Sequence, residues 1–428
     1  MIRTKRLLAV VGVGALLFSW GCKNDASSGS NGNGPGGSAT RPESPGEGNR
    51  VEGDVIKVGV IASLNGELKP WGEDSVRGIQ MAVDEFNAAG GVNGKKVQLV
   101  IEDTASKPEV GKTATEKLVS EDKVVAILGE IASGITQPAA QVAFQYGVPI
   151  ISPGSTRVDI TNIGNNVFRV CFTDNFQGAA MAKFAYEDLG LRRIAILTDK
   201  KLPYSTGLSD VFRQAFTDFG GEIVDEQFYE SGTMDFKPQL TNIKAKNPDG
   251  LFCSGYFNEV GPIARQKEIV GLNVVMLGGD GWDSAKLLTS GGRGIIGGYW
   301  TNHYSNYEKR PQVQRFIQAF KERFGSPPAT AMAPLGYDAA LVLLDALKRA
   351  ESLDSKAITK AIAETANLEA VSGTITIGRD GNAEKSILVL QVTEEARDMP
   401  VKRIEFFRFE PKQRPHPGTL PRGEGEGK

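Results

Sequence analysis

The chain has 428 residues with 49 Lys or Arg and 51 Asp or Glu, so its formal net charge is −2. This balance excludes the basic surface that nucleic-acid-binding proteins normally present. With only two histidines, His303 and His416, and no CxxC pair, we expect neither a metal centre nor histidine-based acid–base catalysis. The length is sufficient for two domains.

Residues 1–21 have the pattern of a secretion signal, in which basic residues precede the apolar run 7–18. A run this short does not comfortably span a bilayer, which needs about 20 residues. It ends in Ser-Trp-Gly-Cys, which resembles the lipobox of bacterial lipoproteins and predicts lipidation at Cys22; a plain signal peptide or a retained anchor is the alternative. Residues 22–50 are predicted to form this lipidated cysteine and a flexible tether, because Ser, Gly, Asn and Pro dominate them.

Strand-like apolar runs and amphipathic helical segments alternate from Val55 onwards. The first series of strands is predicted at 55–62, 96–102, 124–128 and 148–151, and its helices at 108–120 and 135–146, with one more ending at Ala89. Trp71 is assigned to the loop 63–72. This alternation predicts parallel βαβ units and a doubly wound sheet.

A second series of the same kind follows and predicts a second lobe. Its strands are predicted at 168–172, 193–198, 222–228, 250–253, 274–277 and 297–300, and its helices within 174–189 and at 208–219, 236–245 and 261–270. Further helices are predicted at 312–324, 334–349 and 355–364, and strands at 373–377, 386–392 and 403–409. Residues 411–428 are polar and rich in Pro and Gly, which predicts a disordered tail.

Hydroxyl-bearing loops follow two neighbouring predicted strands. Ser133 lies between the strand 124–128 and a helix, and Ser155 and Thr156 follow the strand 148–151. Open α/β sheets bind ligands at the carboxyl ends of their strands, and a helix N-terminus there favours an anion. An anion site for a group such as a carboxylate is one interpretation; ordinary loop and cap chemistry is the other.

Cys171 and Cys253 lie in apolar stretches, which favours two buried free thiols; a disulfide between them stays open.

Three segments together carry a family resemblance: IKVGVIASLNGELKPWGEDSVRGIQMAVDEFNAAGGVNGKKVQLV, TQPAAQVAFQYGVPIISPGST and IAILTDKKLPYSTGL. In order and spacing they resemble the periplasmic branched-chain amino-acid-binding proteins that serve ABC transporters, over about residues 55–409. The resemblance implies a type I periplasmic binding protein fold, an α/β architecture of two doubly wound parallel-sheet lobes joined by three hinge crossings near residues 172, 300 and 377. Lobe one would comprise 55–172 plus 301–377, and lobe two 173–300 plus 378–410.

The resemblance also implies a site between the lobes. Lobe one would hold a ligand carboxylate through Ser133, Gly154, Ser155 and Thr156. Asp280, where the family usually has Glu, would meet the ammonium group. Further matched positions are the acidic Asp174 and four aromatic residues, Trp71, Tyr204, Tyr256 and Tyr337. The positions that match a common family disulfide are Ser106 and Ala132, so we expect that bond to be absent.

The function implied is capture of an amino acid, of the branched-chain type, outside the cytoplasm and its delivery to an ABC permease. The partners are then the amino acid, the permease and a membrane reached through the lipid, with no cofactor and a monomeric state. A sensor of the same fold that signals through a separate partner is an alternative. An enzyme is a second one, although no GxSxG motif, P-loop or helix-opening GxGxxG is present.

Overall fold

The computed structural model describes residues 41–395 and 398–405. The predicted signal segment 1–21, Cys22, the tether up to residue 40 and the tail 411–428 lie outside this part. Within it, no helix combines the length and the apolar character that a membrane span requires.

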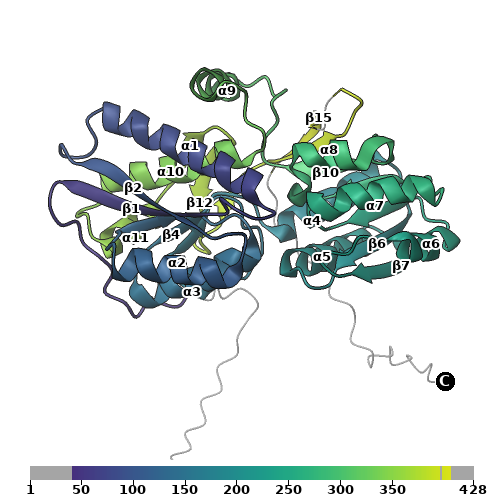
Figure 1. The fold of residues 1–428 in the computed structure, drawn as a ribbon, viewed down its shortest axis with the longest axis horizontal. Helices are drawn as coiled ribbons and strands as arrows, with labels where there is room; N and C mark the ends of the chain where they lie inside the picture. Colours follow the sequence, from purple (N-terminus) through teal and green to yellow (C-terminus); the bar gives the residue numbers. More distant parts are fainter. Residues whose placement is uncertain (1–40, 396–397, 406–428) are drawn as a thin grey trace, which may run out of the picture. The chain divides into compact units, whose positions relative to one another are not determined.

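The first sheet has five parallel strands in the order β2-β1-β3-β4-β5. The strands are β1 Val55–Ala62, β2 Lys96–Asp103, β3 Ala126–Leu128, β4 Ile150–Ser152 and β5 Val167–Arg169. The order reverses between β1 and β3, and such a switch point opens a crevice at the carboxyl ends of the strands. In Figure 1, α1 (Lys69–Ala88) and α10 (Met332–Arg349) cover one face of this sheet, and α2 (Pro108–Ser120) and α3 (Ser133–Tyr146) cover the other.

The second sheet has seven strands in the order β15-β14-β10-β9-β8-β6-β7. Its parallel part, β7-β6-β8-β9-β10, repeats the strand order of the first sheet, whereas β14 and β15 are antiparallel. The strands are β6 Arg193–Asp199, β7 Glu222–Tyr229, β8 Gly250–Cys253, β9 Val275–Gly278, β10 Tyr299–Asn302, β14 Ile387–Gln391 and β15 Met399–Ile404. The helices of this part are α4 Asp174–Lys183, η2 Phe184–Asp188, α5 Pro203–Asp218, α6 Lys237–Ala245, α7 Phe257–Ile269, η3 Asp280–Trp282, α8 Ala285–Gly291 and η4 Gly292–Ile295.

The chain passes three times between the two sheets, so the predicted two-lobe, doubly wound α/β fold is confirmed. The crossings follow β5, β10 and the small antiparallel sheet β11-β12-β13. The remaining elements are η1 Thr161–Ile163, α9 Pro311–Phe324, α11 Ser355–Ala363, β11 Leu368–Ala370, β12 Gly373–Ile377 and β13 Ala383–Glu384. The third crossing comes later than the predicted position near Ile377, because β13 pairs back onto β12 first. Below, lobe one means the first sheet with α1–α3, α10, α11 and the small sheet, and lobe two means the second sheet with α4–α8.

Several helices begin earlier than predicted. Proline stands in the first turn of both α1 and α5, where its fixed φ suits a helix start and its missing N–H costs nothing. Trp71 therefore lies in the first turn of α1 and not in the loop to which the sequence assigned it, and Tyr204 lies in the first turn of α5. The predicted strand 403–409 is β15, which ends at Ile404; residues 406–409 lie outside the described part.

The prediction of a flexible tether up to Arg50 is wrong for residues 41–50, which pack on lobe one. The Arg41 guanidinium donates to the carbonyl oxygens of Gly164 (2.9 Å) and Val167 (2.6 Å). The Asn49 side chain donates to two further carbonyl oxygens, at 2.9 Å each, and its backbone pairs with Ser355. These polar side chains thus provide hydrogen-bond donors to backbone carbonyl oxygens near the amino ends of β3 and β5. Residues 41–50 therefore pack at the edge of the sheet opposite the carboxyl ends of its strands.

Candidate functional site

A small cavity lies where the carboxyl ends of the two sheets meet. Its walls are Trp71, Ile131, Ser133, Gly154, Thr156 and Met332 from lobe one, and Tyr204, Tyr256, Asp280 and Gly281 from lobe two. Seven of the ten predicted site residues are among them: Trp71, Ser133, Gly154, Thr156, Tyr204, Tyr256 and Asp280. The cavity volume is only about 10 Å³, which suffices for about one water molecule, so the lobes must separate to admit a larger solute.

The lobe-one wall is built around the N-terminus of α3. Ser133 is the first residue of this helix, and the helix has no side-chain cap of its own. The amides of Ile131 and Ala132 just before it donate to the buried carboxylate of Glu130 at 2.7 and 2.8 Å. Glu130 also accepts from the Ser63 hydroxyl at 2.5 Å, and its burial raises its pKa. The first turn of α3, with the Ser133 hydroxyl, therefore offers hydrogen-bond donors and positive potential to the cavity.

Ser155 does not line the cavity, contrary to the prediction. It is fully buried, and its Oγ hydrogen bonds to Thr136 Oγ1 at 2.5 Å and donates to the carbonyl oxygen of Ile131 at 2.9 Å. It ties the loop after β4 to the start of α3 and so fixes its neighbours Gly154 and Thr156 in the wall.

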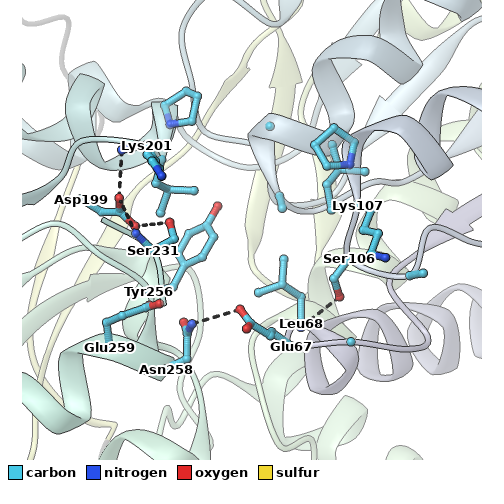
Figure 2. A pocket seen from close by; sticks show the side chains of 18 residues that line it. Glu67, Leu68, Ser106, Lys107, Asp199, Lys201, Ser231, Tyr256, Asn258 and Glu259 are labelled. Carbon is cyan, nitrogen blue, oxygen red and sulfur yellow. Dashed lines mark hydrogen bonds between the residues drawn. The ribbon is translucent and has the colours of Figure 1, made fainter. Parts of the chain in front are cut away.

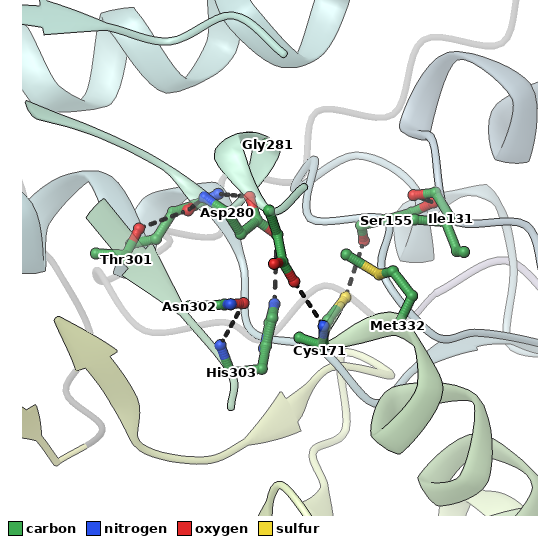
Figure 3. A network of polar contacts seen from close by, with 12 residues as sticks. Ile131, Ser155, Cys171, Asp280, Gly281, Thr301, Asn302, His303 and Met332 are labelled. Atoms are coloured by element: carbon green, nitrogen blue, oxygen red, sulfur yellow. Dashed lines mark hydrogen bonds and ion pairs between the residues drawn. The ribbon is translucent and has the colours of Figure 1, made fainter. Parts of the chain in front are cut away.

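Asp280 is the charged residue of the lobe-two wall. It opens the short η3 turn after β9, and its Oδ1 accepts from Tyr204 Oη at 2.9 Å and from Gln177 Nε2 at 3.1 Å. Its Oδ2 lies 3.3 Å from His303 Nε2 (Figure 3). Burial raises the pKa of Asp280 to about 6, against the opposing effect of the Tyr204 and Gln177 hydrogen bonds.

Gln177 connects this carboxylate to a second one. Its Oε1 accepts from Thr301 Oγ1 at 3.0 Å and from the Asp280 amide at 3.2 Å, which turns its Nε2 towards both carboxylates. Nε2 donates to Asp174 Oδ1 at 2.7 Å. Burial, and next the charge of Asp280, raise the pKa of Asp174 to about 7. Asp174 lies behind the wall and does not line the cavity, which corrects its predicted place.

His303 follows the carboxyl end of β10 and completes the support of Asp280. Its ring is fully buried and stacks on Phe172, with ring centroids 3.6 Å apart. Burial holds its pKa well below the usual value, so His303 is neutral and, in the tautomer with hydrogen on Nε2, donates to Asp280. Neither His303 nor Gln177 was predicted from the sequence as a residue of this site. His303 could have been identified as a polar residue directly after the carboxyl end of a strand. Gln177 could have been identified because it lies one helical turn after Asp174.

Tyr337 does not line this cavity, contrary to the prediction. It lies on a face of α10 that is turned towards α1 and α9, where its hydroxyl donates to Glu85 at 2.6 Å and its ring packs on Phe316. It lines a separate cavity there. Met332, at the start of the same helix, reaches the site, and Ile131 and Gly281 are the other two wall residues that sequence reasoning missed.

A wider groove of about 440 Å³ lies beyond Tyr256 at the mouth of the cavity. Figure 2 shows that both lobes line it, with Leu68, Ser106 and Lys107 on one side and Asp199, Lys201 and Ser231 on the other. Asn258 Nδ2 donates across it to Glu67 at 3.3 Å. Burial raises the pKa of Glu259, which also lines the groove, to about 7.

Cys171 and Cys253 are free and buried, which confirms the first interpretation of these cysteines. Burial raises the pKa of each thiol to about 12. Ser106 and Ala132, the positions matched to the family disulfide, both line the groove at the mouth. In the part of the chain that the structure describes, no three His, Cys, Asp or Glu side chains group as metal ligands would.

Two α/β lobes that meet around a small cavity, with hydroxyls and a helix N-terminus on one wall and a carboxylate on the other, have the architecture of a two-lobe solute-binding protein. The sequence profile described as "Periplasmic binding protein" matches residues 55–397, and the chain belongs to this family. The family consists of solute-binding proteins and not of enzymes.

Individual relatives agree with this assignment. The chain is 32% identical over 332 residues to a Leu/Ile/Val-binding protein homologue from Brucella melitensis, which covers 76% of this chain and 88% of the relative. A leucine-binding protein from Thermotoga maritima superposes with a TM-score of 0.77 at 37% identity, covering 82% of this chain and 99% of that one. A branched-chain amino-acid transporter substrate-binding protein from Streptococcus pneumoniae, solved with isoleucine, gives a TM-score of 0.76 at 29% identity over 83% and 99% of the two chains.

Proposed function

We propose that this protein captures a branched-chain amino acid between its lobes and delivers it to an ABC permease. One observation carries the proposal: the carboxylate of Asp280 and the N-terminus of α3 line opposite walls of the same cavity. An α-amino acid has one positive and one negative group attached to the same carbon, and these two walls suit its two ends. The relatives named for leucine, isoleucine and valine support the same ligand class.

Each wall residue has a role in this proposal. The first-turn amides of α3 and the hydroxyls of Ser133 and Thr156 bind the carboxylate, and the backbone beside Gly154 approaches it closely. Asp280 binds the ammonium group, and Tyr204, Gln177 and His303 hold Asp280 in place. Because the two charged groups of the ligand engage different lobes, only the closed state satisfies both, and ligand binding shifts the population towards closure.

The rest of the wall favours an uncharged side chain. Trp71, Ile131, Met332 and Tyr256 provide apolar contact, and Asp280 is the single charged residue among the ten that line the cavity. A charged ligand side chain would have no counter-charge within these walls, and burying it would be costly. An apolar side chain gains from leaving water.

For the residues outside the described part, the proposal keeps the sequence interpretation. Residues 1–21 direct export, a lipid on Cys22 holds the protein on a membrane surface, and the protein acts as a monomer. A sensor that passes the signal to a separate partner is the second candidate. Uptake and gene expression in a strain that lacks this gene separate the two: unchanged amino-acid uptake with altered expression supports the sensor.

Titration calorimetry with leucine, isoleucine and valine tests the ligand site. We expect Asp280→Ala to weaken binding more than tenfold, because a dehydrated ammonium group loses its counter-charge. Asp249→Asn is the matched control, since Asp249 accepts from the amides of Arg192 and Arg193 inside lobe two, away from the cavity; it should leave the affinity within twofold. An Asp280→Ala variant that binds as tightly as the wild type contradicts the site, and heat that keeps evolving with turnover contradicts a binding-only protein.

A further inference from the structure

Asp283 belongs to lobe two, yet both its carboxylate and its carbonyl oxygen accept hydrogen bonds from lobe one. Its carboxylate Oδ2 accepts from the backbone amide of Ala331 at 2.6 Å, at the start of α10. Its carbonyl oxygen accepts from Trp71 Nε1, also at 2.6 Å. Asp283 is buried and does not line the cavity, so these contacts join the lobes beside the proposed ligand site and outside it.

The turn that carries Asp283 is firmly attached to lobe two. Trp282, its neighbour, is fully buried and donates through Nε1 to the carbonyl oxygen of Cys253 at 3.0 Å. The amide of Asp283 donates to the carbonyl oxygen of Asp280 at 3.1 Å, which closes the turn. Asp280 and Asp283 therefore move together: one faces the cavity and the other reaches across to lobe one.

The N-terminus of α10 receives two carboxylates, one from each lobe. Asp74 on α1 accepts from the Thr330 amide at 2.7 Å and from the Thr330 hydroxyl at 3.0 Å, and this contact stays within lobe one. Asp283 accepts from the next amide along the chain, that of Ala331. A negative charge is favourable at this end of a helix, and its hydrogen bonds to amides are charge-assisted. Separation of the lobes breaks the Asp283 contact and leaves the Asp74 contact intact.

We propose that Asp283 is an interlobe latch, a positioning residue that stabilises the closed lobes without touching the solute. This rests on the proposed function, in which closure accompanies capture. The latch acts in the ligand-free protein as well, and so sets how large a fraction of it is closed. Since the apparent dissociation constant is the intrinsic one divided by the closed fraction, loss of the latch must lower the closed-to-open ratio and must raise the apparent dissociation constant by the factor by which the closed fraction falls.

The test measures both quantities in the same variants of the full-length protein. Fluorescent labels are attached through azide side chains introduced at Thr113 in α2 and Thr241 in α6, which are exposed and lie on different lobes. Single-molecule energy transfer then gives the closed-to-open ratio without ligand, and calorimetry gives the dissociation constant for leucine. We expect Asp283→Ala to lower the ratio roughly tenfold and to raise the dissociation constant by the factor by which the closed fraction falls, with Asp283→Asn intermediate.

Asp74→Asn is the matched control. It removes a negative charge at the same N-terminus of α10, but its hydrogen bonds join two parts of lobe one and do not connect the lobes. It should lower the melting temperature with and without ligand and leave the closed-to-open ratio within twofold. If Asp283→Ala fails to fold, Asp283→Asn decides in its place.

The latch is overturned if the ratio in the Asp283 variants stays within twofold of the wild type. It is equally overturned if binding weakens while the ratio does not change, or if the ligand-free wild type shows only the open distance. A wild type that binds none of the amino acids contradicts the proposed function, and the ligand-free ratios still decide the latch.

Discussion

Asp280 is a buried carboxylate, and the three side chains that contact it, Tyr204, Gln177 and His303, are all neutral. Neutral donors orient the carboxylate without cancelling its charge, so it keeps a strong preference for a cation. Asp174 lies behind it on the same glutamine amide. Two buried carboxylates this close compete for a proton, which links ligand binding to pH.

We expect the affinity for an amino acid to rise with pH between 5 and 8. The pKa of Asp280 is raised to about 6 and that of Asp174 to about 7, so below these values a proton occupies the place of the ammonium group. Binding should weaken by up to about tenfold for each pH unit below 6. Calorimetry across this range, in buffers with different ionisation enthalpies, should show proton release near pH 6.

In the ligand-free protein, the contribution of these carboxyl groups to stability changes with pH in the direction opposite to the affinity. A carboxyl group with a raised pKa binds more protons folded than unfolded, so its contribution to the free energy of unfolding falls as pH rises from about 4 to 7. The increase in melting temperature caused by ligand should therefore grow over the same range. Asp174→Asn should make this increase less dependent on pH, and an affinity independent of pH in the wild type would contradict the assignment.

The sequence predicts a site residue only where its place at the end of a strand or the start of a helix already determines that its side chain points into the cavity. Ser133 and Thr156 follow from hydroxyls at the carboxyl ends of neighbouring strands. Ser155 shares that loop but points inward, and Tyr337 lies on the wrong face of its helix; neither direction is encoded in spacing alone. Asp280 came from the family resemblance, because an aspartate between glycines is ordinary turn chemistry in most chains.

At the scale of elements, the close crossing of α1 and α10 builds the lobe-one wall. Gly78 lies against the backbone of Ala333, and Gly336 lies against the backbone of Ser75, so a Cβ on either glycine would overlap a carbonyl oxygen. This approach brings Trp71, near the start of α1, and Met332, at the start of α10, into the same wall. The two glycines thus allow the close approach of α1 and α10 that places the first turns of both helices at the cavity.

Gly336→Ala should destabilise the protein by about 1–3 kcal/mol, because the helices must move apart to admit the methyl group. Gly207→Ala is the control: Gly207 lies in α5 with no atom within 4 Å of the added Cβ, and alanine should stabilise that helix by up to about 1 kcal/mol. Urea unfolding of both variants measures the difference. Equal stabilities would show that α1 and α10 tolerate a wider separation.

Sequence patterns predict which helices and strands exist better than they predict the residues at which these elements begin and end. β1, α2, β8 and β12 have the predicted bounds, because apolar runs and a proline start mark them clearly. The starts of α1 and α5 were missed although Pro70 and Pro203 mark them. The packing of residues 41–50 could not be predicted, since it depends on backbone carbonyls that come together only when the sheet forms.

At the scale of the whole molecule, two lobes of the same strand order face each other and the chain crosses between them three times. The repeated alternation of strands and helices predicts two lobes, and the resemblance supplies their connection. The contacts that hold the lobes together join residues far apart in the chain: Trp71 and Asp283 are 212 positions apart, and Asp283 and Ala331 are 48 apart. No local pattern encodes them, so the closed arrangement emerges only from the structure.

Closure should be visible in the fluorescence of one tryptophan. Trp71 lies between the lobes, packed edge-on against Tyr256 with ring centroids 5.0 Å apart, whereas Trp282 and Trp300 are fully buried within lobe two. In the open state Trp71 meets water, so saturating ligand should shift the emission to shorter wavelength and reduce quenching by acrylamide. Trp71→Phe should abolish both changes, and Trp300→Phe should retain them because lobe two keeps its own packing as the lobes move. A shift that survives Trp71→Phe would mean that ligand binding rearranges the interior of lobe two, and that the lobes do not move as rigid halves around the cavity.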